Sequence, residues 1–389
     1  MTHVAASAFA WTAGPRQAKL LLVGEAHGQS EAESGLRQPF VGQSGQELQR
    51  MLHQAIPDIA PNLASETESM MRYGYAWVPL RNRWLETAGI AMTNVLALRP
   101  EGNQLETLCA KKAEMPHDYS WPPLVRGQYL RPEYLPELTR LYDEIRSISP
   151  NIIVCLGNTA CWAILYATNI GSIRGACCAA VAPQVGGTKC LSTYHPAGVL
   201  RQWSWRTIVV ADLMKAWREA QFPEIRRPAR TVLINPTLAE CETWLGQCRM
   251  RPPDLLSVDI ETGQGQIKCI GFARSRGEAL VVPFVDLTRP SGSYWPTAQD
   301  ERRAWDCVSA LLALPVTKVF QNGVYDLQYL MRMGLTVARC TEDTMLLHHS
   351  LFPELQKGLG FLGSIYSNEA SWKLMRRAKT KDEGEKRDE

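Results

Sequence analysis

Short apolar runs alternate with amphipathic stretches over the first 220 residues of the chain. The runs at residues 19–23 and 88–98, and the runs IIVCLG and CLST, have the length and unbroken hydrophobicity of buried strands. Apolar residues recur at helical spacing in residues 46–56, 135–148, 159–167 and 208–220. Strands that alternate with helices predict an α/β fold built on a parallel sheet.

The pattern changes after FPEIRRP, at residues 222–228. A strand and a helix follow, and SVDIETG, CIGFARS and ALVVPFVD then predict three strands in quick succession. A helix at residues 300–314, the strand VTKVF and the helix GVYDLQYLMRMG come next. We therefore predict two domains, at residues 1–222 and 229–389, joined by a linker at residues 223–228.

Composition and charge exclude several classes of protein. The net charge of +3 gives no global positive field, so affinity for nucleic acid must come from local patches. The eleven cysteines are scattered without a C-x-x-C pair, which argues against a zinc ribbon or a ferredoxin-type cluster. No signal peptide and no membrane-length apolar run are found. We therefore expect a reduced, soluble, cytoplasmic protein with no membrane partner.

A glycine-rich turn, within LVGEAHGQSEAESGLRQPFVGQSGQEL, follows the first predicted strand. Gly24 and Gly28 allow backbone bends that bring Glu25 and His27 to the carboxyl edge of the sheet. Ligands of open α/β sheets bind at this edge. The turn is therefore the first candidate site.

Three motifs fall at predicted strand ends of the first domain: GEAHG with PFVG, TNV at residues 93–95, and TYHPAGVLR at residues 193–201. In this order and spacing they resemble the uracil-DNA glycosylase superfamily, most of all its family with a GE-x-PG first motif. The resemblance covers residues 19–220. It implies an αβα domain with a parallel sheet and an enzyme that removes uracil from DNA.

The resemblance assigns roles to five residues. Cleaving an N-glycosidic bond leaves negative charge on the base, and His195 is the donor aimed at the base oxygen. The extruded base stacks on Phe40, and the amide of Asn94 pairs with uracil but mismatches cytosine. Glu25 orients the attacking water or stabilises the cationic sugar, and Glu31 crowds the methyl group of thymine.

The chain departs from this family at three points. His27 replaces the usual proline and becomes a further catalytic candidate, and two extra residues lie between Gly35 and Phe40. The iron–sulfur cysteines of the family are missing, so we predict no iron–sulfur cluster and no cofactor for the glycosylase. After the last motif, Leu200 and Arg201 match the turn that enters the DNA duplex behind the flipped base.

A second group of acidic residues lies in the second domain. Asp259 and Glu261 are two apart on a predicted strand, so both carboxylates point to one face. Asn322 and Asp326, in QNGVYDLQYL, are four apart and share one side of a helix. With EDTMLLHHSLFPELQKGLGFLGSIY, these motifs resemble the DEDD-type 3′-to-5′ exonuclease domain of family A DNA polymerases over residues 229–370. The resemblance implies a ribonuclease H-like domain with a mixed sheet.

Exonucleases of this type hold two metal ions for phosphodiester hydrolysis. The resemblance makes Asp259, Glu261 and Asp326 the ligands of Mg²⁺ or Mn²⁺. The closing motif of the family, a tyrosine followed four residues later by an aspartate, is missing, because Tyr366 is followed at that spacing by Ala370. We therefore expect an exonuclease domain that is incomplete at its C-terminus, in the front part of a longer polymerase or in a natural short form. Its activity should be weak or absent.

Taken together, the motifs predict a uracil-DNA glycosylase joined to a polymerase-type exonuclease domain. The expected partners are DNA that contains uracil, single- or double-stranded, and a polymerase in the same polypeptide or in a phage-like replication complex. One alternative is a module that binds uracil or a DNA end without cleaving it. Another is a glycosylase for a modified pyrimidine, since the extra residues beside Phe40 can enlarge the pocket.

Overall fold

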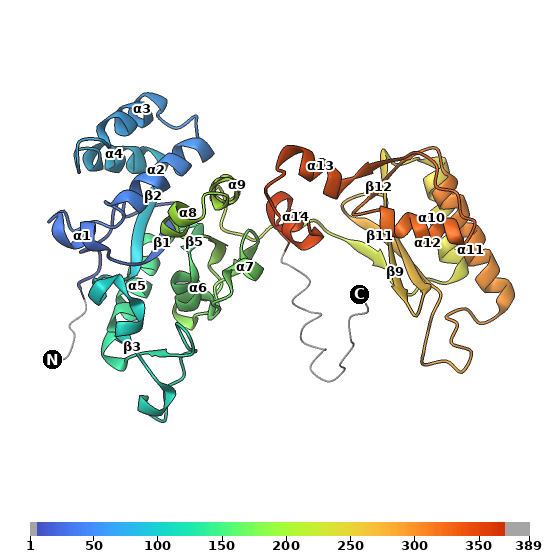
Figure 1. Cartoon of the computed structure of the whole chain (residues 1–389), viewed down its shortest axis with the longest axis horizontal. Coiled ribbons are helices and arrows are strands. Elements are labelled where there is room, and N and C mark those ends of the chain that lie inside the picture. The colour runs from blue at the N-terminus through green and yellow to red at the C-terminus, as the bar shows by residue number, and fades with distance from the viewer. Residues whose placement is uncertain (1–5, 370–389) are drawn as a thin grey trace. The chain divides into compact units, whose positions relative to one another are not determined.

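The computed structural model describes residues 6–369, which divide into two compact units. The first unit runs to Ile225 and also contains the segment that begins at Gly360. The second unit runs from Arg226 to Leu359. Figure 1 labels the helices and strands of both.

A five-stranded sheet forms the centre of the first unit. In spatial order its strands are β2 (Ile90–Leu96), β1 (Leu20–Ala26), β5 (Ile152–Leu156), β7 (Lys189–Thr193) and β6 (Cys177–Ala179). The first four are parallel, which confirms the predicted sheet, and β6 runs antiparallel at the edge. The sequence pattern did not reveal β6, because three residues are too few to show a period.

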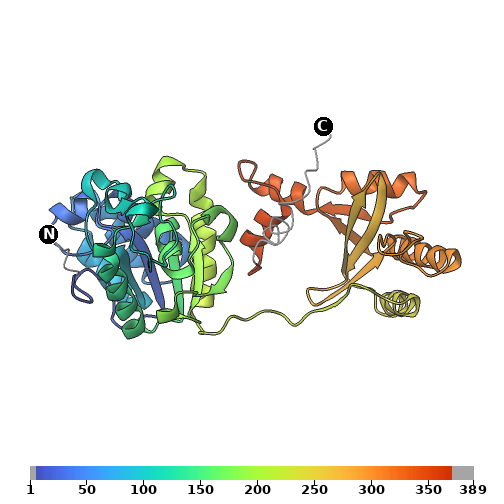
Figure 2. The same ribbon diagram turned by 90° about the horizontal axis from the view of Figure 1, so that it is seen from below.

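Helices cover both faces of this sheet, as Figures 1 and 2 show. Leu21 and Val23 of β1 face one core, which is closed by α5 (Leu135–Ile148) and α6 (Asn158–Leu165). Leu20 and Leu22 face the other, which is closed by α2 (Gln43–Ala55), α4 (Val78–Ala88) and α9 (Trp205–Glu219). The alternation along β1 thus produces a three-layer α/β domain.

Shorter elements complete the first unit. They are α1 (Gln29–Glu33), α3 (Pro61–Met70), α7 (Ile170–Ile173), α8 (Pro196–Arg201) and α14 (Leu359–Tyr366), the last from Gly360 on. Residues 101–133 contain a small antiparallel ladder of β3 (Cys109–Ala110) and β4 (Tyr129–Leu130). Cys109 and Leu130 are buried in the core under α5 and α6.

The second unit has a six-stranded mixed sheet. In spatial order its strands are β13 (Cys340–Asp343), β12 (Thr317–Phe320), β9 (Leu255–Gly263), β10 (Gln266–Ala273), β11 (Glu278–Pro283) and β8 (Thr231–Leu233). β10 is antiparallel to both neighbours, whereas the other pairs are parallel. This confirms the predicted mixed sheet.

Helices α10 (Leu238–Met250) and α11 (Ala298–Ala313) pack against the second sheet. Val258 and Ile260 of β9 belong to the core beneath them, whereas Asp259 between them points away. The second unit also contains α12 (Val324–Arg332) and α13 (Thr344–Leu351). Within residues 6–369, no helix is both long and apolar enough to cross a membrane.

Candidate active site

A cavity of about 340 Å³ opens beside the carboxyl end of β1. The strand order of the sheet reverses there, since β2 lies on one side of β1 and β5 on the other, and open α/β sheets bind ligands at such points. Of the residues singled out in the sequence, those lining the cavity are Glu25, His27, Glu31, Phe40, Asn94, His195 and Arg201. Ser44, Pro100 and Asn103 also line it, although no motif pointed to them.

Gly24 lets two of these side chains approach the backbone of β1. A Cβ atom at Gly24 would lie 2.3 Å from Oδ1 of Asn94 and 2.4 Å from Cζ of Phe40. The amide and the ring therefore lie directly over this glycine, and no larger residue fits there. Oδ1 of Asn94 is buried and has no hydrogen-bond partner within residues 6–369.

Phe40 is held in a left-handed backbone conformation, with φ of 55°. Arg81 is fully buried and donates from Nη1 to the carbonyl oxygens of Pro39 at 2.9 Å and Phe40 at 2.7 Å. Gly45 allows the turn to close, because a Cβ there would lie 1.9 Å from the carbonyl oxygen of Phe40. Sequence reasoning missed Arg81, since its partners are backbone atoms about 40 residues away.

Glu31 ties two sides of the loop together. Its Oε2 accepts from the backbone N–H of Gly28 at 3.0 Å, and its Oε1 accepts from those of Val41 at 2.8 Å and Gly42 at 3.4 Å. The carboxylate is buried and lines the cavity. It therefore fixes the position of the segment that carries Phe40, in addition to its predicted contact with the base.

His195 precedes α8, and its Nδ1 accepts a hydrogen bond from the backbone N–H of Ala197 at 3.2 Å. This bond assigns the ring proton to Nε2, which leaves Nε2 as a donor. Burial lowers the pKa of His195 below 6.5, although Glu25 acts in the opposite direction. The neutral ring lies with its centroid 5.9 Å from that of Phe40.

Two buried contacts hold the strand ends that carry Glu25 and Asn94. Thr159 of α6 donates from its hydroxyl to Oε2 of Glu25 at 2.5 Å. Arg140 of α5 donates to the backbone oxygen of Asn94 at 2.7 Å and to Glu144 at 2.8 Å. Thr159 and Arg140 carried no recognisable motif, and their roles follow from the packing of α5 and α6 on the sheet.

The predicted DNA-entering turn forms the end of α8. Leu200 is 44% exposed, Arg201 is exposed, and only Arg201 of the two lines the cavity. Trp203, which follows, is also exposed, whereas Trp205 stacks on Tyr194 with centroids 4.1 Å apart. An apolar side chain and a cation thus project from the rim.

The family model of the uracil DNA glycosylase superfamily matches residues 11–221 of the chain. The chain belongs to this superfamily. The match spans the first sheet and every residue of the cavity, so we call the first unit the glycosylase unit. No curated protein matches the chain.

The acidic candidates of the second unit lie near one another. Asp326 is buried in α12, and its Oδ1 accepts from the backbone N–H of Ile260 at 2.9 Å. Burial raises the pKa of Asp326 to about 6, and the carboxylate of Asp259 adds to this increase. Burial and the neighbouring Glu261 likewise raise the pKa of Asp259.

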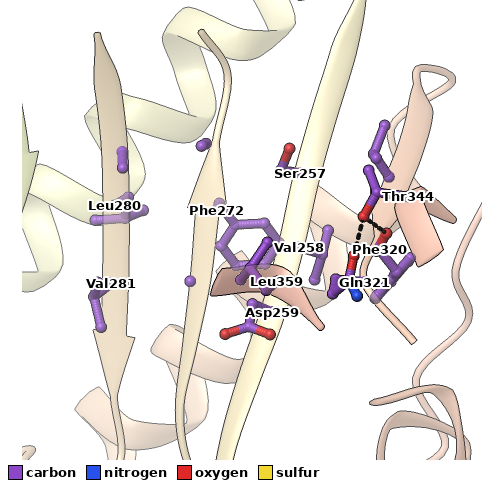
Figure 3. Close-up of a pocket in the computed structure, with 14 residues that line it drawn as sticks. Ser257, Val258, Asp259, Phe272, Leu280, Val281, Phe320, Gln321, Thr344 and Leu359 are labelled. Carbon is purple, nitrogen blue, oxygen red and sulfur yellow. Dashed lines mark hydrogen bonds between the residues drawn. The ribbon is translucent and has the colours of Figure 1, made fainter. Parts of the chain in front are cut away.

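A cavity of about 310 Å³ lies on the same side of the sheet as Asp259. Figure 3 shows Asp259 at this cavity together with Phe272 and Leu359. Most of its lining is small or apolar. Among residues 6–369, no three acidic, histidine or cysteine side chains stand close enough to hold a metal ion. The donor set as it stands therefore does not fit a metal centre.

One sequence prediction about the second unit is wrong. Asn322 does not share a helix face with Asp326, because it lies before α12 with a φ of 60°. Its backbone N–H and that of Gly323 donate to the side chain of Asp343, at 3.2 Å and 2.7 Å. Asp343 also caps α13, because its side chain accepts from the backbone N–H groups of Met345 and Leu346.

Solved structures similar to the chain include two exonucleases. Escherichia coli RNase D, an exoribonuclease involved in structured RNA processing, is 16% identical with a TM-score of 0.26. The similarity covers 37% of this chain and 34% of RNase D, so the chain spans about a third of that protein's length. The EXD2 exonuclease domain soaked in Mn and GMP is 19% identical with a TM-score of 0.24, over 40% of this chain and 78% of that domain. Likeness at this level says nothing about activity.

Proposed function

We propose that the glycosylase unit hydrolyses the N-glycosidic bond of uracil in DNA. The observation that carries this proposal is the single cavity that contains Phe40, Asn94, His195 and Glu25 at a sheet edge. Superfamily membership supports a glycosylase-type function and implies DNA as the substrate. The cavity adds a stacking ring, a buried amide oxygen, a neutral donor and a carboxylate.

Recognition of the base follows from Phe40 and Asn94. An extruded pyrimidine stacks on the ring of Phe40. In the described part of the chain, Oδ1 of Asn94 is a buried acceptor without a partner, which is costly until a donor arrives. Uracil brings such a donor at N3, whereas cytosine has an unprotonated N3 and an amino group at C4. The amide therefore favours uracil.

His195 and Glu25 then catalyse cleavage of the N-glycosidic bond. As the bond between C1′ and N1 breaks, its electron pair moves onto the base and negative charge develops on O2. Nε2–H of His195 stabilises that charge without having to lose its proton, since the ring is neutral and Nδ1 is already an acceptor. Glu25 stabilises the positive charge on the sugar and orients the water that adds to C1′. Glu25 takes one proton from that water, and the uracil anion leaves and is protonated by solvent.

The test is release of uracil from single- and double-stranded oligonucleotides that carry one uracil, with cytosine at the same position as the control. Loss of one preorganised donor costs roughly a hundredfold to a thousandfold in rate. We therefore expect His195→Ala to lose at least that much while DNA binding persists. His117→Ala is the matched control, because His117 is exposed. No release by the unsubstituted chain, or full release by His195→Ala, would refute the proposal.

For the second unit we propose little or no 3′-to-5′ exonuclease activity in this chain. Its Asp259, Glu261 and Asp326 are the candidates for Mg²⁺ or Mn²⁺, and the absence of a three-ligand group among residues 6–369 supports weak metal binding. A link to a DNA polymerase, in the same polypeptide or in a replication complex, also stays a proposal. Its support is the sequence motif alone.

A further inference from the structure

Residues 360–369 follow the second unit in the sequence but belong to the glycosylase unit. We call these residues the strap. The strap contacts Arg174 and Lys215, two charged side chains of the glycosylase unit that are almost fully buried, and Arg174 in turn pairs with the buried Asp212. These contacts need explanation, because a buried charge is costly unless it is paired and hydrogen-bonded.

Lys215 depends on the strap for most of its hydrogen bonds. Its ammonium donates to the carbonyl oxygens of Gly175 at 2.5 Å, Ser364 at 2.6 Å and Ser367 at 2.6 Å. An ammonium has three donors, and two of these three acceptors are backbone atoms of the strap. Beside it, Nδ2 of Asn368 donates to Oε1 of Glu219 at 2.6 Å.

Arg174 connects the strap to Asp212 of α9. It donates to Asp212 through Nε at 3.1 Å and Nη2 at 2.8 Å, and its Nη1 donates to the hydroxyl of Ser364 at 2.8 Å. Its guanidinium also lies 5.5 Å from the ring centroid of Phe361. A Cβ at Gly175 would lie 2.5 Å from the carbonyl oxygen of Ser364, so the strap approaches the backbone as closely as glycine allows.

We propose that the strap is an integral part of the glycosylase unit, so that the second unit is an insertion within that unit. Without the strap, Lys215 and Arg174 would lose acceptors at buried positions. The contacts also reach the active site, because Asp212 accepts from the hydroxyl of Thr193 at 2.7 Å, two residues before His195. Through Arg174 and Asp212, the strap thus supports Thr193, the last residue of β7, and His195 follows this strand at the start of α8.

The test uses the full chain with two inserted protease sites, one in the exposed segment 226–230 and one between Lys357 and Gly358. After both cuts, size-exclusion chromatography and mass spectrometry show which piece retains the fragment that begins at Gly358. We expect it to elute with the glycosylase unit, and we expect Lys215→Met to release it. Elution of the fragment alone or with the second unit, in the unsubstituted protein, would overturn the proposal.

Lys189→Met is the matched control. Lys189 is also buried, and it also donates to three carbonyl oxygens, those of Glu219 at 2.7 Å, Phe222 at 2.7 Å and Glu224 at 2.9 Å. None of these carbonyl acceptors belongs to the strap, although the side chain of Glu219 pairs with Lys189 at 3.2 Å and also accepts from Asn368 of the strap. Lys189→Met should therefore destabilise the same unit but retain the fragment, and equal release by both variants would contradict a specific role of Lys215.

Hydrogen exchange of the uncut chain gives a second measurement that does not require the pieces to separate. The backbone N–H of Ser367 is bonded to Gly363 at 2.9 Å, and we expect it to exchange slowly. Exchange of the strap should rise at least tenfold in Lys215→Met and not in Lys189→Met. Strap amides that exchange at the rate of exposed chain in the unsubstituted protein would also overturn the proposal. Neither measurement depends on uracil cleavage.

Discussion

The backbone N–H of Ala197 donates to Nδ1 of His195 at 3.2 Å. A second proton on Nδ1 would face this donor, so the bond and the burial both favour the neutral ring. The acid limb of uracil release should therefore lie below pH 6.5, the ordinary pKa of histidine. The check is kcat/KM as a function of pH. His195→Gln keeps an N–H donor but does not titrate, so it should retain more activity than His195→Ala and should lose the acid limb. If the acid limb is unchanged in His195→Gln, a group other than His195 causes it.

Asn94→Asp should weaken the preference for uracil over cytosine. The carboxylate keeps an acceptor but removes the donor N–H₂ of the amide, so the match to the pairing edge of uracil is lost. We expect the ratio of uracil to cytosine release to fall at least tenfold. Competition between the two substrates in one reaction measures this ratio directly. If the ratio stays constant while both rates fall, Asn94 supports the site without reading the base.

His27 should affect the choice of base. Its Nε2 is buried without a partner within residues 6–369, its ring centroid lies 4.2 Å from that of Trp11, and it lines the cavity. A substrate with an additional polar group can satisfy this nitrogen, which favours the modified-pyrimidine alternative. We expect His27→Ala, which removes the ring but keeps the backbone N–H that donates to Leu98 at 3.0 Å, to reduce release of 5-hydroxymethyluracil more than release of uracil. Equal effects on both bases would argue against this role.

Acid should destabilise the glycosylase unit through His27 and His53. Burial lowers the pKa of each from 6.5 to about 4. Between pH 6.5 and about pH 4, these histidines are protonated in the unfolded chain but not in the folded chain. The folded state therefore loses stability as the pH falls from 6.5 to about 4. The loss amounts to at most about 3 kcal/mol for each histidine.

The melting temperature measured between pH 7 and about pH 4.5 checks this effect. His53→Gln removes one titrating group, can keep the contact with Gln49, and should flatten the pH dependence. His117→Gln, at an exposed position, is the control and should leave it unchanged. An unaltered slope in His53→Gln would show that His53 does not contribute.

The second unit should degrade a labelled 3′ end very slowly, or not at all, with Mg²⁺ or Mn²⁺. Metal binding requires ionised carboxylates, and since burial raises the pKa of Asp326 to about 6, any binding should strengthen as the pH rises through that value. Titration of Mn²⁺ from about pH 5 to pH 8 measures this, with Asp326→Asn as the control. Rapid digestion that Asp259→Ala abolishes would contradict the prediction.

Local patterns in the sequence are sufficient for the four parallel strands and for the motifs that meet at the cavity, whereas the mixed sheet was expected from the resemblance to the exonuclease domain. Apolar runs must be buried, and parallel strands place their carboxyl ends at one edge. Glu25, Asn94 and His195 therefore come together at this edge once their strands join one parallel sheet. The error at Asn322 has a local cause, since a left-handed residue before α12 interrupts the helical spacing.

The features that only the tertiary structure could decide are hydrogen bonds between residues far apart in the chain. Arg81 holds the turn at Phe40, and Lys215 takes carbonyl partners from Ser364 and Ser367, about 150 residues later. Backbone carbonyl acceptors have no signature in the sequence, because every residue carries one. The sequence alone therefore determined the four parallel strands of the first sheet and the reactive side chains. The tertiary structure decided which buried charged residues hold these strands and side chains in place. It also decided to which unit residues 360–369 belong. Neither can be predicted from residue types, because hydrogen bonds to the backbone depend on the positions of the atoms.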